Sequence, residues 1–96
     1  MELVIFARFH AREGREGAIA TLLAEQVVLA RGEPGCLAIG AYRSHRDARL
    51  FFIHSRWIDE AAFEIHAKLP RTLGFVEAAE RLIDHQFDVT RTQRIA

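Results

Sequence analysis

The chain has 96 residues, half of them hydrophobic, and its 13 basic and 13 acidic side chains give a formal net charge of zero. This length fits one domain over residues 1–96, and the neutral balance gives no electrostatic reason to expect nucleic acid or a membrane as a partner. The single cysteine, Cys36, excludes an internal disulfide, and the N-terminus lacks the basic and apolar regions of a signal peptide, so we expect a cytoplasmic protein.

The first half of the chain predicts a strand, a helix and a second strand. Residues 2–10 are rich in β-branched and aromatic side chains at both alternating positions, so both faces of this strand should be covered. Residues 15–31 repeat apolar side chains at helical spacing, and a glycine follows them. A turn containing Pro34 then leads into a strand over 36–43, whose small residues allow close approach of a bulky group. The helical stripe comprises Ile19, Leu22, Leu23, Val27 and Ala30, and the residues mostly off it are Glu16, Glu25, Gln26 and Arg31.

The second half predicts a hairpin partner, two helical segments and a last strand. Residues 49–57 pair with the preceding strand and again carry large apolar residues on both faces. Asp59 is suited to cap a helix over 60–68, and a proline separates that helix from a second one over 71–83. In the last strand, residues 85–92, apolar side chains alternate with polar ones, which indicates an edge position.

The element order β-α-β-β-α-β is that of the ferredoxin-like fold, an α+β fold with both helical regions on one face of a four-stranded antiparallel sheet. Val4, Phe6 and one apolar side of the third strand must then lie on the uncovered face. Such a face exceeds what a monomer usually exposes, so we predict a homodimer in which two sheets pack together about a two-fold axis. His54, on the side opposite Trp57, is expected at this interface. The alternative is a monomer that binds a ligand on the open face.

Three stretches of the chain form a recognisable pattern: Val4-Ile5-Phe6-Ala7-Arg8-Phe9 through Glu13-Gly14, the turn Glu33-Pro34-Gly35-Cys36, and Arg56-Trp57 followed by Ala61, Ala62, Phe63 and His66. Together they resemble the antibiotic biosynthesis monooxygenase-like (ABM-like) family of dimeric α+β barrels. This resemblance implies a pocket in each protomer between the sheet and its helices. It further implies oxidation of a quinol or polyphenol by O2 without flavin, heme or metal.

The resemblance also suggests which residues form the site. His66 is the candidate catalytic base, because it shares a helix face with Phe63 and imidazole has an unperturbed pKa of about 6.5. Trp57 is the second catalytic candidate; it could wall the pocket, or it could be a core aromatic. The histidines show no metal-ligand spacing, so no metal is expected, and the resemblance implies that no other cofactor is needed. The residues predicted to bind the substrate are Phe63, Tyr42, Phe51 and Ser55.

Ser55 departs from the family pattern, which commonly has a glutamate two residues before the tryptophan. A buried carboxylate beside the base is therefore expected to be missing, and this favours an alternative role as a non-catalytic binding or sensing dimer. An isomerase or decarboxylase with a histidine base is a third possibility. Heme degradation is disfavoured, because the heme-degrading branch uses an asparagine on the first strand and this chain contains none.

Overall fold

The computed structural model describes residues 1–96 and confirms the predicted order of strands and helices, with the second helical region divided at Leu69. None of the three helices has the length and apolar character needed to cross a membrane. The elements are β1 (Leu3–His10), α1 (Glu16–Ala30), β2 (Cys36–Arg43), β3 (Leu50–Trp57), α2 (Glu60–Lys68), α3 (Pro70–Leu82) and β4 (Asp88–Thr92).

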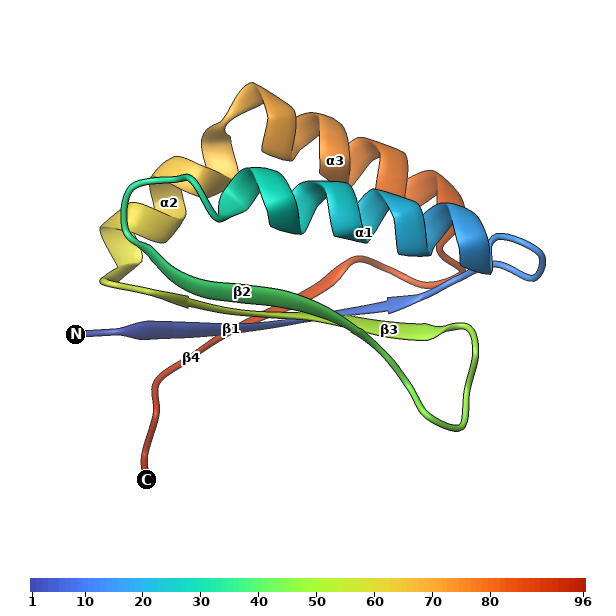
Figure 1. The fold of residues 1–96 in the computed structure, drawn as a ribbon, viewed down its shortest axis with the longest axis horizontal. Helices are drawn as coiled ribbons and strands as arrows, with labels where there is room; N and C mark the ends of the chain where they lie inside the picture. The colour runs from blue at the N-terminus through green and yellow to red at the C-terminus, as the bar shows by residue number, and fades with distance from the viewer.

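The four strands form one antiparallel sheet in the order β2-β3-β1-β4. All three helices cover the same face of this sheet, and the opposite face has no cover within the chain (Figure 1). The central pairing of β1 with β3 places Ile5 opposite Ser55 and Phe6 opposite His54. Because side chains alternate along a strand, Ile5 and Ser55 face the helices whereas Phe6 and His54 lie on the open face.

The hydrophobic core lies between the sheet and the helices. Phe9 of β1 and Ile19 of α1 are fully buried there, and the ring of Phe9 meets that of Phe75 edge-on, with 6.0 Å between centroids. Asp59 caps α2 as predicted, since its carboxylate accepts a hydrogen bond from the backbone N–H of Ala62 at 2.9 Å. These contacts hold the helical layer over one face of the sheet.

The last strand begins at Asp88, three residues later than predicted. The preceding segment turns inward instead of pairing with β1: the ring of Phe87 packs on Phe9 at 5.5 Å. The backbone N–H of Asp84 donates to the carbonyl of His10 at 3.0 Å and holds the start of the segment. The chain before Asp88 thus buries the ring of Phe87 instead of pairing with β1. The alternation of apolar and polar side chains alone does not distinguish these two arrangements.

The open face carries exposed aromatic side chains. Phe6 is 50% exposed and Tyr42 56% exposed, and the ring of Phe6 lies 5.1 Å from that of His54. Gly40 provides space for the Tyr42 phenol, because a Cβ atom at residue 40 would lie 2.7 Å from its hydroxyl oxygen. The small residues predicted to admit a bulky group therefore admit a side chain of the same strand.

Candidate active site

A cavity of about 320 Å³ lies between the sheet and the helices. This volume is at the lower end of the range of roughly 300–1,000 Å³ that is typical of small-molecule sites. Val89 and Arg91 of the edge strand β4 line the cavity and are exposed, so it reaches the surface beside that strand. The lining residues that carry polar side chains are Gln26, Ser55, His66, Thr72 and Arg91.

His66 of α2 lines the cavity and is held by a buried carboxylate. Its Nδ1 atom lies 2.6 Å from Oε1 of Glu33, and the Glu33 side chain is only 5% exposed. The second oxygen of Glu33 accepts a hydrogen bond from Arg71 at 2.7 Å. A carboxylate only accepts, so the hydrogen of the neutral imidazole resides on Nδ1, and Nε2 keeps a free lone pair. Nε2 has no hydrogen-bond partner within the chain.

The turn before β2 brings the side chain of Glu33 against α2. Gly35 has a φ angle of +84°, and a Cβ atom at this residue would lie 2.6 Å from Cβ of Ala62 in α2. The carbonyl of Gly35 accepts a hydrogen bond from the N–H of Ile58 at 2.9 Å, which fixes the turn against the end of β3. Only glycine combines this conformation with so close an approach, so Gly35 sets the distance between Glu33 and α2.

Aromatic rings hold the imidazole from the side. Trp57 and Phe63 lie with their ring centroids 4.7 and 5.6 Å from that of His66. The Trp57 indole is completely buried and donates a hydrogen bond to Oγ of Ser55 at 3.0 Å. Ser55, Phe63 and His66 line the cavity, but Trp57 does not. The indole packs against the imidazole of His66 without forming part of the cavity wall. The indole can orient the histidine without touching a ligand.

Two further polar side chains of the cavity have no partner in the protein. Gln26 of α1 is 5% exposed and its amide makes no hydrogen bond within the chain. Thr72, in the first turn of α3, is 6% exposed, and its hydroxyl oxygen is a buried polar atom without a hydrogen-bond partner. Buried polar atoms in proteins are nearly always paired, so the hydroxyl of Thr72 is exceptional.

Arg91 lies where the cavity meets the surface and is held by α2. Its guanidinium donates to Glu60 at 2.8 Å and also to Glu64, and it stacks over the Phe63 ring at 5.0 Å. The hydrogen bond from Arg91 lowers the pKa of Glu64, and the two glutamates raise the pKa of Arg91. Two carboxylates therefore balance the positive charge of Arg91, which favours a neutral ligand over an anion at this end of the cavity.

Two of the predicted substrate-binding residues lie outside the cavity. Tyr42 pairs with Phe52, on the open face of the sheet, because it occupies the other alternating position of β2. Phe51 faces the helices but lies in the core at the far end of β3, where Arg43 stacks over its ring at 4.9 Å. Neither side chain can contact a ligand bound beside His66.

Glu33 and Gln26 are site residues that the sequence interpretation missed. The sequence pattern places Glu33 only in a turn. The expected lack of a buried carboxylate is wrong, since Glu33 supplies one from a different segment. The prediction that Gln26 lies off the apolar stripe is wrong, because it lies three residues after Leu23 and seven after Ile19 and is buried with them. A polar residue at this position of an apolar helical stripe was a usable signal of a lined cavity.

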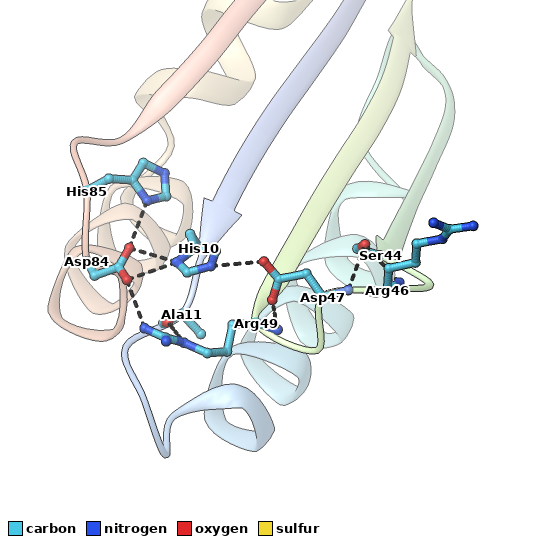
Figure 2. Close-up of polar contacts among 8 residues, drawn as sticks. All are labelled: His10, Ala11, Ser44, Arg46, Asp47, Arg49, Asp84 and His85. Atoms are coloured by element: carbon cyan, nitrogen blue, oxygen red, sulfur yellow. Dashed lines mark hydrogen bonds and ion pairs between the residues drawn. The ribbon is translucent and has the colours of Figure 1, made fainter.

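A second polar cluster lies at the far end of β1, where His10 bridges two carboxylates (Figure 2). Nδ1 of His10 lies 2.9 Å from Asp84, and Nε2 lies 3.2 Å from Asp47. Arg49 donates to Asp84 at 2.9 Å, and His85 lies against the same carboxylate at 3.4 Å. These side chains are hydrogen-bond or ion-pair partners of one another, and they join the end of β1 to two loops. We call this cluster of His10, Asp47, Arg49, Asp84 and His85 the His10 clamp and assign it a structural role.

Cys36 has none of the features of a nucleophile. Partial burial, followed by the negative charge of Glu33, raises the pKa of its thiol. A catalytic cysteine requires the opposite shift, toward the thiolate.

Comparisons with known proteins agree with this fold. The profile of the family described as antibiotic biosynthesis monooxygenase matches residues 3–78, and no curated protein sequence matches the chain. Rv0793 from Mycobacterium tuberculosis superposes with a TM-score of 0.92 at 23% identity, covering 100% of this chain and 97% of that one. PA3566 from Pseudomonas aeruginosa gives 0.89 at 28% identity, covering 99% and 95%. A crystal structure described as an antibiotic biosynthesis monooxygenase gives 0.90 at 22% identity, covering 98% and 99%.

Proposed function

Because the chain belongs to the antibiotic biosynthesis monooxygenase family, we propose that it is a cofactor-independent monooxygenase that oxidises a quinol or polyphenol with O2. The observation that carries this proposal is the hydrogen-bonded series Arg71–Glu33–His66, which ends at a free imidazole nitrogen in an apolar cavity. Such an arrangement supplies a base of fixed orientation, which oxidation of a phenol without a cofactor requires.

His66 begins the reaction by taking the hydroxyl proton of the bound substrate onto Nε2. The imidazolium then donates one hydrogen to Glu33 and holds the other near the substrate, and the buried carboxylate stabilises its charge. Arg71 holds the carboxylate in place from its other oxygen. The apolar lining, which includes Ile5, Ile53 and Phe75, excludes water from the anion.

The anion is electron-rich at the ring carbons and passes an electron to O2, after which the two radicals combine in a carbon–oxygen bond. The peroxide takes back the proton from His66. Cleavage of its O–O bond, with loss of the hydrogen from the same carbon, releases water and leaves a carbonyl. One oxygen atom enters the product and the other enters water, and the substrate supplies all the electrons. The chain therefore needs to provide only a base, an orientation and a dry cavity.

Oxygen uptake by metal-free protein tests this proposal. A panel of hydroquinones, including 1,4-dihydroxynaphthalene, is expected to consume O2 faster with the wild-type protein than in buffer. His66→Ala should lower the turnover rate by about 10²–10⁴-fold, the usual contribution of a general base. Glu33→Gln should also lower the turnover rate, because it removes the carboxylate that orients His66. Glu77→Gln, which removes an exposed carboxylate of α3, is its matched control. Uptake no faster than in buffer, together with saturable binding, would instead support a binding or sensing role.

The same proposal includes a homodimer formed through the open face of the sheet. Support comes from Phe6 and Tyr42, the exposed aromatic side chains of that face. All three helices lie on the other face of the sheet (Figure 1). A second copy would bury them by placing one sheet against the other, leaving the helix-side cavity in each protomer.

A further inference from the structure

The cavity has two separate groups of polar side chains that come from different helices. His66 lies on α2, whereas Thr72 lies on α3 and Gln26 on α1. The proposed reaction uses only His66. A role for Thr72 and Gln26 must therefore explain why two polar side chains, each more than nine-tenths buried, line an apolar cavity without partners.

The hydroxyl of Thr72 is exceptional because it has no hydrogen-bond partner in the protein. It lies in the first turn of α3, where Leu69 at the N-cap position provides no side-chain hydrogen bond. The start of a helix carries a partial positive charge, which favours an electronegative atom nearby. A threonine hydroxyl and a glutamine amide can each donate to such an atom, so together they are suited to an oxygen of a ligand.

We propose that Thr72 and Gln26 bind a second oxygen substituent of the aromatic substrate whose hydroxyl is deprotonated by His66. The inference rests on the proposed function and adds the two residues that would select an aromatic diol over a ring with a single hydroxyl group. Ala67 and Val76 provide apolar surface in the same cavity for the ring. The two oxygens would fix the ring in one orientation, which decides the carbon that O2 attacks.

Binding measured without oxygen tests this inference independently of turnover. Calorimetric titration under anaerobic conditions compares 1-naphthol with 1,4-, 1,5- and 1,8-dihydroxynaphthalene. The wild-type protein is expected to bind at least one diol about five- to tenfold more tightly than 1-naphthol, the effect of one good hydrogen bond. Thr72→Val and Gln26→Leu should each reduce this ratio, and cooperative unfolding in urea shows that the variants are folded.

Two further variants test whether the preference for a diol depends on the hydroxyl group of Thr72. Thr72→Ser retains a hydroxyl and should retain the ratio, and Thr21→Val changes an exposed threonine of α1 and should have no effect. The inference is overturned if no diol is preferred, or if the preference survives in both Thr72→Val and Gln26→Leu. A preserved preference with no oxygen uptake would refute the oxygenase proposal alone, and uptake without any preference would refute this inference alone.

Discussion

The carboxylate of Glu33 lies 2.6 Å from Nδ1 of His66, although 33 residues separate the two along the chain. Both side chains are buried, and Arg71 occupies the second carboxylate oxygen. This pairing gives His66, the proposed base, an orienting acid that the expected position, Ser55, does not provide. The acid comes from the turn before β2 instead of from β3, so the same chemical function is supplied by a different segment.

Substitution of Gly35 should disturb this pairing. Gly35→Ala places a Cβ atom against Ala62, whereas Gly14→Ala, with a similar φ angle of +81°, meets no atom within 4 Å. Each variant should lose roughly 1–2 kcal/mol of unfolding free energy from the left-handed backbone conformation. Gly35→Ala should lose more and also lose turnover, because the turn that carries Glu33 must move. Urea denaturation and oxygen uptake measure the two effects, and equal behaviour of both variants would contradict this explanation.

Removal of the Thr72 hydroxyl should stabilise the protein in the absence of ligand. Valine has nearly the same shape, and a buried polar group without a partner costs about 1–3 kcal/mol. The free energy of unfolding of Thr72→Val, measured in urea, is therefore expected to rise by about 1 kcal/mol. Thr21→Val, at an exposed position in α1, should change it little. A destabilised Thr72→Val variant would show that the hydroxyl has a structural partner.

The His10 clamp should make the stability of the fold depend on pH in the acidic range. The hydrogen bond from His10 is the main cause that lowers the pKa of Asp84, and the backbone N–H of Arg49, followed by His10, lowers that of Asp47. A carboxyl pKa that is lower in the folded state stabilises the fold in full above the unfolded value of about 3.9, and this contribution is lost as the pH falls through the folded value.

Asp84→Asn should accordingly lower the melting temperature at pH 7, and its difference from the wild type should shrink at pH 3. Thermal denaturation at the two pH values measures this change. Glu13→Gln, at an exposed turn position without hydrogen bonds, is the control and should follow the wild type. A difference that stays constant between pH 7 and pH 3 would argue against the clamp.

The open face should determine the oligomeric state. Phe6→Asp introduces a charge on the open face, where the interface is proposed, and should yield a monomer in size-exclusion chromatography with light scattering. Ile65→Asp alters an apolar residue of α2 that is 67% exposed, so it should remain a dimer. A wild-type monomer, or a dimer disrupted by Ile65→Asp and not by Phe6→Asp, would place the interface elsewhere.

Local patterns predicted most of the fold, because strand alternation, helical spacing and the Asp59 cap are properties of neighbouring residues. They also led to His66, Phe63 and Ser55, which share the cavity. Glu33 could not be found in this way, since its partner lies on a distant helix and their contact depends on how the turn packs against α2. Tyr42 was misplaced because the composition of β2 does not reveal which alternating side faces the helices.

The role of His66 as a proton acceptor can be measured without oxygen. A chromogenic phenol, 4-nitrophenol, absorbs visible light as its anion, so its ionised fraction can be read when it is bound to excess protein at a fixed pH. The wild type should raise this fraction above that in buffer, Glu33→Gln should raise it less, and His66→Gln should not raise it. Equal ionised fractions in the wild type and His66→Gln, with the phenol bound to both, would contradict the assignment of His66 as the base.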